Sequence, residues 1–248
     1  MRLGTTRRNA RATPDAMTIA GHLIELRRRF LIATASVAVM GVVAFVLYNP
    51  LFSFLVHPYC VAFPHHCKLN AFSPLDNLTL RFKIAGYGGL LFASPIVLWE
   101  FWRFITPGLK HDEKRYAIPF VLASIVLFLI GCGLAYWSFE HALVFLKNIG
   151  GNNLQSTYGA NQYLSLLLLV MFLYGITFIF PVILTALELV GVLSSAQLLH
   201  WWRPAVIIIT CAAALFTPTG DPLSMIFLMI PLIVFYFASI LAGRLLGK

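Results

Sequence analysis

Charged side chains are scarce in this sequence. Only 11% of its 248 residues are Asp, Glu, Lys or Arg, whereas soluble domains carry about 25%. Hydrophobic residues make up 60%. This composition excludes an ordinary soluble domain and indicates an integral membrane protein. The net charge of +9 therefore bears on orientation in the membrane rather than on nucleic-acid binding.

The beginning of the chain lacks a cleavable secretory signal. Residues 1–16, MRLGTTRRNARATPDA, are polar and basic and contain no apolar core. They are predicted to form a disordered cytoplasmic tail. Residues 17–248 are predicted to form a single membrane domain. Translation could start at Met1 or at Met17, and the sequence does not decide between them.

Apolar runs of membrane-spanning length predict an all-α membrane protein with six transmembrane helices. The expected spans cover residues 30–48, 84–104, 116–139, 163–187, 204–217 and 222–243. The fifth and sixth are expected to be short. Prolines lie inside or beside most of these runs, and kinked helices tend to pack into a concave, cupped arrangement.

Basic residues predict the orientation of these spans. With six spans, 14 of the 18 Lys and Arg residues fall on the side that holds both termini. Because cytoplasmic loops carry an excess of Lys and Arg, both termini are predicted to be cytoplasmic. The first outer loop includes NPLFSFLVHPY, residues 49–59, which is apolar enough for a short interfacial helix.

Four carboxylates gather at the cytoplasmic ends of the spans rather than at the membrane midplane. They are Glu25, Glu100, Glu113 and Glu188, and Asp112 adjoins the third. This distribution argues against ion paths through the membrane and favours a cytoplasmic surface that recognises a cationic ligand. For any single one of these carboxylates, the alternative is an ordinary structural role in the helix or loop that carries it. Glu25, for example, stands four residues before Arg29 and could simply form a helical ion pair.

No enzyme, cofactor or metal site is expected. The sequence contains no phosphate-binding loop and no paired nucleophile and base. The histidines and cysteines of HPYCVAFPHHC, residues 57–67, match no standard zinc spacing. Because this loop is predicted to be extracytoplasmic, a disulfide between Cys60 and Cys67 is favoured instead.

Several motifs in order resemble those of the TatC family, the multispanning receptor subunit of the twin-arginine protein translocase. They are HLIELRRR, SPLDNLTLRFK, SPIVLWEFWRFITPGLKHDEKR, GITFIFPVILTALELVGV, RPAVIIIT and FTPTGDPLSM. The resemblance covers about residues 17–243. It implies a protein of the cytoplasmic membrane that binds the twin-arginine signal peptides of folded proteins. It also implies single-span TatA- and TatB-type partners, self-association in a receptor complex, and export driven by the proton-motive force.

The same resemblance assigns residues to roles. Glu25 and Glu113 correspond to the family's arginine-binding carboxylates. Arg27 and Arg29 are expected to hold these carboxylates, and Phe104 and Pro107 to shape the adjoining loop. Pro58 is expected to be structurally important. The positions where partner helices dock correspond to Thr217, Pro218, Asp221 and Met225.

One position departs from the family pattern. Many members carry a glutamate within the fourth span, where this sequence has Ile179. A contact that depends on that glutamate cannot be carried over.

The main alternative function is a small-molecule secondary transporter, which predicts midplane charges and internal repeats. Neither is found in this sequence, whereas the prolines leave open the unwound helices that this alternative also predicts. A purely structural membrane scaffold is the second alternative, in which Glu25 and Glu113 would have no role.

Overall fold

The computed structural model describes residues 19–64, 67–105, 117–150, 158–217 and 222–245. The helices in these ranges are α1 (Ile19–Val46), α2 (Tyr48–Ala62), α3 (Asp76–Ile105), α4 (Ala117–Gly150), α5 (Ala160–Leu189), α6 (Ser195–His200), α7 (Trp202–Phe216) and α8 (Pro222–Leu245). Within the described residues, the one β-type pairing is an isolated bridge between Asn70 and Gly159. The predicted all-α class is confirmed.

Five described helices, α1, α3, α4, α5 and α8, are long and apolar enough to cross a membrane, and α7 is shorter at 15 residues. Each of the six predicted spans falls on one of these helices. The sixth span agrees with the expected residues 222–243, because α8 has 24 residues, continues through Pro231 and is shorter than α1, α3, α4 and α5. At 1.5 Å per residue it is about 36 Å long. Helix α2 confirms the short helix expected in the first outer loop.

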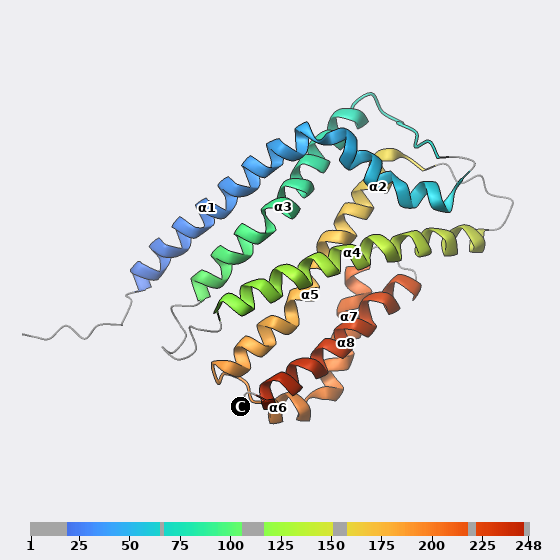
Figure 1. The fold of residues 1–248 in the computed structure, drawn as a ribbon. Coiled ribbons are helices and arrows are strands. Elements are labelled where there is room, and N and C mark those ends of the chain that lie inside the picture. Colours follow the sequence, from blue (N-terminus) through green and yellow to red (C-terminus); the bar gives the residue numbers. More distant parts are fainter. Residues whose placement is uncertain (1–18, 65–66, 106–116, 151–157, 218–221, 246–248) are drawn as a thin grey trace, which may run out of the picture.

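The helices form an open array in which α5 is central (Figure 1). Helix α5 packs against α3, α4 and α8, whereas α1 lies along α3 at one edge and α7 lies along α8 at the other. Little of α1 is therefore buried within the protein. An open array of this kind is compatible with the concave face expected from the prolines.

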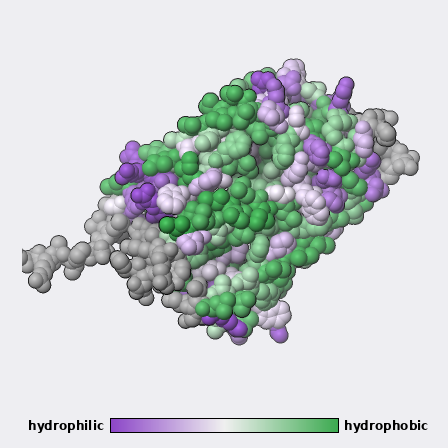
Figure 2. All heavy atoms as spheres, viewed as in Figure 1, coloured by the Kyte–Doolittle hydropathy of each residue, from purple (hydrophilic) through white to green (hydrophobic). Residues whose placement is uncertain are grey.

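The core lies along α5, as expected for a helix surrounded by others. Leu164, Leu167 and Tyr174 are fully buried, and Phe178 is nearly so. Large apolar side chains are exposed on the outer helices instead, which suits a protein surrounded by lipid. Figure 2 shows a broad hydrophobic surface on one face, with hydrophilic side chains gathered toward the ends.

Prolines within the helices leave backbone carbonyls without their usual donors, because proline has no N–H. Pro58 would otherwise donate to the carbonyl of Phe54, which instead accepts a hydrogen bond from Tyr136 Oη at 2.9 Å. Pro95 leaves the carbonyl of Leu91 free, and Ser94 Oγ donates to it at 2.7 Å. Side-chain hydroxyls therefore satisfy two groups that would be costly to leave unpaired in a membrane.

A tight corner connects α5 to α6. Gly191 adopts a left-handed conformation, with φ of 78°, and its N–H donates to the carbonyl of Glu188 at 3.0 Å. The N–H of Val192 donates to the carbonyl of Leu187, which completes a glycine-dependent helix end. Ser194 and Gln197 then form a capping box that starts α6.

Candidate functional site

Arg29 holds two carboxylates at the end of the molecule where α1 begins. Its Nε and Nη2 atoms lie 3.0 and 2.5 Å from Glu25 Oε1, one helical turn earlier. Its Nη1 atom lies 2.9 Å from Oε2 of Glu100, near the end of α3. The three side chains are only 11% to 19% exposed. One guanidinium is therefore shared by two largely buried carboxylates, so this group of three carries a net charge of −1.

Close packing of α1 against α3 brings these residues together. The two helices run in opposite directions, so the start of α1 meets the end of α3. Their backbones approach closely at Gly41 and Gly89. A Cβ atom built on Gly89 would lie 2.6 Å from the Gly41 backbone and 2.9 Å from the carbonyl oxygen of Val37. Small residues allow this approach between membrane helices.

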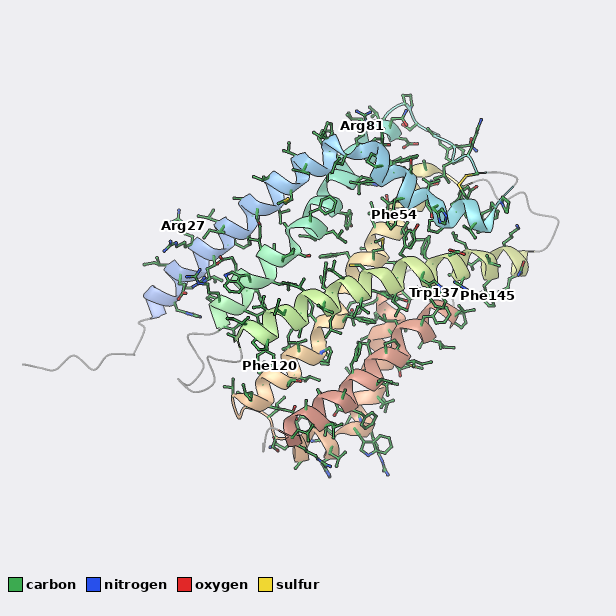
Figure 3. The ribbon with its side chains drawn as sticks, viewed as in Figure 1. Arg27, Phe54, Arg81, Phe120, Trp137 and Phe145 are labelled. Atoms are coloured by element: carbon green, nitrogen blue, oxygen red, sulfur yellow. A yellow bond between two sulfur atoms is a disulfide. The ribbon has the colours of Figure 1, made fainter. Side chains whose placement is uncertain are left out.

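Aromatic contacts fix the end of α3 that carries Glu100. The buried Trp102 donates from Nε1 to Ser124 Oγ at 2.7 Å and stacks on Phe120 of α4. Phe104 stacks on His22 of α1, with ring centroids 4.4 Å apart. Helix α3 is therefore attached to α4 on one side and to the first turns of α1 on the other. Figure 3 shows Phe120 on α4 and Arg27 on the first part of α1.

A pocket of about 390 Å³ opens beside the shared guanidinium. It lies between α1 and α3, so its walls come from two helices that are distant in sequence. Its lining combines charged and apolar side chains: Gly21, Ile24, Glu25, Arg28, Arg29, Ile32, Glu100 and Arg103. The pocket can therefore offer carboxylate oxygens to a cationic ligand and apolar surface to the ligand's neighbouring residues.

The two predicted holding arginines differ. Arg29 holds both carboxylates as described, whereas Arg27 is exposed and makes no ion pair with a described residue. The physical reason is helical geometry, because a residue two positions after Glu25 points to another face of the helix. Among the described residues Arg27 therefore holds no carboxylate, and Glu113, the other carboxylate it was expected to hold, lies outside them.

The sequence did not predict Glu100 as a partner of Arg29. It stood out only as a carboxylate near the end of an apolar run, and pairing across 71 positions depends on how α1 packs on α3. Glu113 and Pro107 lie outside the described residues, so the structure gives no position for either.

The residues expected to contact partner helices are only partly described. Thr217 follows the last residue of α7 as its C-cap, is buried, and donates from Oγ1 to the carbonyl of Ala213. Met225 is partly buried on α8 and packs against the core. Pro218 and Asp221 lie outside the described residues.

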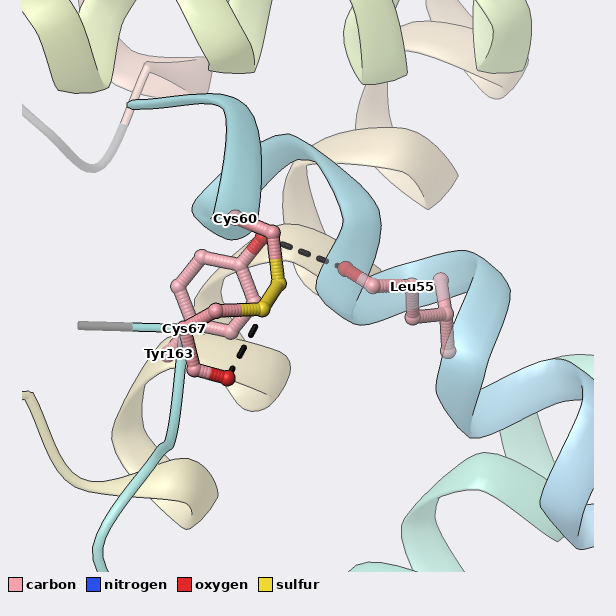
Figure 4. Close-up of a disulfide and its surroundings, with 4 residues drawn as sticks. All are labelled: Leu55, Cys60, Cys67 and Tyr163. Carbon is pink, nitrogen blue, oxygen red and sulfur yellow. Dashed lines mark hydrogen bonds between the residues drawn. A yellow bond between two sulfur atoms is a disulfide. The ribbon is translucent and has the colours of Figure 1, made fainter. Parts of the chain in front are cut away.

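The opposite end of the molecule contains a disulfide between Cys60 of α2 and Cys67 (Figure 4). Nearby, Tyr163 of α5 donates to the carbonyl of Leu55 at 3.1 Å. The chain after Cys67 continues to Asn70, whose carbonyl accepts from the N–H of Ala160 at 2.9 Å. The disulfide therefore anchors the outer end of α2 to a segment that is attached to the start of α5.

No group of three or more His, Cys, Asp or Glu residues that could hold a metal ion occurs in the described ranges. His65 and His66, which gave the outer loop its metal-like appearance, are outside those ranges. Cys60 and Cys67 are engaged in the disulfide.

Residues 21–231 match the family model described as Sec-independent protein translocase protein (TatC). The chain belongs to the TatC family. A TatC protein from Frankia casuarinae is 35% identical, and the match covers 96% of this chain and 69% of the relative. A TatC protein from Synechocystis sp. is 34% identical, with coverage of 94% and 90%. The crystal structure of the twin-arginine translocase receptor TatC superposes with a TM-score of 0.77 at 33% identity, and the match covers 92% of this chain and all of that one.

As a member of the TatC family, this chain is a multi-pass membrane protein and a component of a protein translocase. Ile179, where many members carry a glutamate, lies in an apolar cluster with Leu98, Phe128 and Cys132. Its side chain is 7% exposed and fills that cluster. This part of α5 is therefore packed as an ordinary apolar interface.

Proposed function

We propose that this TatC protein binds the twin-arginine signal peptides of folded proteins at its cytoplasmic face. As a TatC protein it is a core subunit of the twin-arginine translocase. The observation that carries the proposal is the arrangement of Glu25 and Glu100 around one guanidinium, beside an open pocket. Arg29 occupies these carboxylates in the way that an arginine from a peptide would.

Guanidinium chemistry explains why arginine is preferred over lysine. A guanidinium presents a planar fork of N–H donors that matches carboxylate oxygens, and a lysine ammonium cannot reproduce this geometry. Because Arg29 donates to one oxygen of Glu25 and to one of Glu100, the other oxygen of each can accept from a ligand. We propose that Glu113 contributes a further carboxylate from the loop after α3. The apolar part of the signal would then lie along Ile24 and Ile32.

The proposal includes an orientation in the cytoplasmic membrane. The arginine-rich start of α1 would face the cytoplasm with both termini, in keeping with the distribution of basic residues. The Cys60–Cys67 disulfide lies at the other end, where an oxidising compartment would preserve it. TatA- and TatB-type subunits would act as partners through the region of Thr217, Pro218, Asp221 and Met225. Transport would depend on the proton-motive force, without enzymatic activity of this chain.

Binding of a fluorescent twin-arginine peptide to the purified protein tests the proposal. The matched ligand is a peptide with two lysines, and the test variant combines Glu25→Ala with Glu113→Ala. A hydrogen bond to a charged group contributes about 1.5–3 kcal/mol, so the double variant should weaken arginine-peptide binding by at least about tenfold. It should also remove the preference over the lysine peptide.

Glu140→Ala provides the control. Glu140 is a carboxylate in the C-terminal part of α4, and it does not line the pocket between α1 and α3. This variant should bind both peptides as the unmodified protein does. The milder Glu25→Gln plus Glu113→Gln pair keeps side-chain size in case the alanine variant does not fold. Equal binding of both peptides by the unmodified protein would refute the proposed receptor site.

A further inference from the structure

The pocket beside Arg29 contains more positive than negative charge. Its lining includes three arginines and only two glutamates. Both glutamates already bind Arg29. Arg28 of α1 and Arg103 of α3 are exposed, and neither makes an ion pair with a described residue. An arginine approaching the carboxylates would therefore meet two like charges at the entrance of the pocket.

The positions of these two arginines at the ends of apolar runs are those expected for residues at the level of lipid headgroups. Arg28 lies two residues before the uncharged run of α1, and Arg103 lies in the last turn of α3. The exposed aromatic side chains Phe30, Trp99 and Phe101 are close to them in sequence. Aromatic side chains with neighbouring arginines are typical of the membrane–water interface, where lipid phosphates lie.

We propose that Arg28 and Arg103 together bind the phosphate of an anionic phospholipid headgroup at the entrance of this pocket. Guanidinium groups suit phosphate, because each can donate two N–H bonds to its oxygens. The two arginines come from opposite walls of the pocket, so one phosphate can be held between α1 and α3.

This inference rests on the proposed function and adds a lipid requirement to it. A bound anionic lipid supplies one negative charge and cancels the excess positive charge of the pocket. Repulsion of the incoming arginines would then fall, and the carboxylates would bind the signal more tightly. A zwitterionic lipid such as phosphatidylcholine also carries a phosphate, but it adds no net charge.

The test measures peptide binding in nanodiscs of two compositions at equal ionic strength. One contains phosphatidylcholine alone and the other also contains phosphatidylglycerol. The unmodified protein should bind the twin-arginine peptide about five- to tenfold more tightly with phosphatidylglycerol, the size expected for one nearby charge in a partly screened site. Nanodiscs without the protein measure how much peptide binds to the lipid itself, and this amount is subtracted.

The deciding variant is Arg28→Gln plus Arg103→Gln, which removes both phosphate ligands from exposed positions. It should bind the peptide in phosphatidylcholine at least as tightly as the unmodified protein does with phosphatidylglycerol, and its affinity should no longer depend on lipid. Arg244→Gln is the matched control, since Arg244 is an exposed arginine in the last turn of α8. The control should keep the full lipid dependence.

Three results would overturn the inference. If Arg28→Gln plus Arg103→Gln keeps the lipid dependence of the unmodified protein, the lipid acts through the membrane surface and not through this pocket. If inorganic phosphate added to phosphatidylcholine nanodiscs reproduces the effect of phosphatidylglycerol, the site binds phosphate from solution. If arginine preference persists equally in both lipids, the lipid site fails while the receptor stands. Absence of any arginine preference would instead refute the proposed function itself.

Discussion

Arg29 Nη1 lies 2.9 Å from Glu100 Oε2, although the two residues are 71 positions apart. Arg29 also pairs with Glu25, so both ion pairs among the described residues converge on this one guanidinium. The contact joins the first turns of α1 to the end of α3. Because α1 otherwise buries little surface, the position of Glu25 depends strongly on this contact and on the packing of α1 against α3.

Replacing Glu100 with Gln should destabilise the protein and loosen the start of α1. The change removes one charged partner of Arg29 but leaves Glu25 in place. We expect a loss of about 1–2 kcal/mol, less than for a fully buried ion pair because both side chains remain slightly exposed. Thermal unfolding in detergent measures the loss. Glu140→Gln is the control, and equal melting temperatures for the two variants would contradict the prediction.

Adding one methyl group at Gly89 should separate α1 from α3. A Cβ atom at this position would lie 2.6 Å from the backbone of Gly41, which cannot move aside as a flexible side chain would. Gly89→Ala should therefore lower the melting temperature and weaken binding of a twin-arginine peptide, through the displaced Glu25. Gly86→Ala on the same helix is a close control, because a Cβ at Gly86 meets nothing within 4 Å. The idea fails if both alanine variants behave alike.

The sequence predicted the helices of this protein better than their contacts. Runs of uncharged apolar residues are long, so each predicted span corresponds to a helix. Helix α8 agrees with the expected span of residues 222–243, and it continues through Pro231 because neighbouring helices can satisfy the backbone group that a proline leaves free. Glu25 and Arg29 are one turn apart and could be paired from spacing alone. Glu100 could not, because the sequence does not indicate that Gly41 and Gly89 allow α1 and α3 to pack so closely.

Tyr136 and Pro58 should be coupled in stability although they lie on different helices. Tyr136 Oη donates to the Phe54 carbonyl, which is free because residue 58 is proline. Tyr136→Phe should cost about 0.5–1.5 kcal/mol in the unmodified protein. In a Pro58→Ala background the restored N–H can bind that carbonyl, so the same change should cost clearly less. A double-mutant cycle from thermal unfolding measures this difference. Purely additive effects would rule out the coupling.

Reduction of the Cys60–Cys67 disulfide should destabilise the outer end of the molecule and leave the arginine-binding end intact. Closing a loop of this length stabilises a protein by about 2–3 kcal/mol in the chain-entropy model. Cys60→Ser plus Cys67→Ser should therefore lower the melting temperature by the same amount as a reducing agent. The reducing agent should have no further effect on that variant. Peptide affinity is the second readout, and a large loss of affinity on reduction would show that the two ends are coupled.

Glu188 should be replaceable by an apolar residue with a gain in stability. Its side chain is fully buried at the end of α5, and neither carboxyl oxygen has a hydrogen-bond partner among the described residues. The Ser195 hydroxyl lies in the same corner, close enough to act on this carboxyl group as a weak donor but without the geometry of a full hydrogen bond. Burying a polar group without a hydrogen bond costs about 1–3 kcal/mol, so Glu188→Leu should raise the melting temperature in detergent.

Gly243→Ala provides the opposite control for this corner. A Cβ at Gly243 would lie 2.6 Å from Glu188 Oε2 and 2.5 Å from Ser195 Oγ, so the added methyl group should destabilise the protein. Combining it with Glu188→Ala removes the main obstacle and should restore much of the loss. A lower melting temperature for Glu188→Leu would contradict the prediction. Normal folding of that variant with loss of export would instead show that the translocase uses this buried carboxyl group.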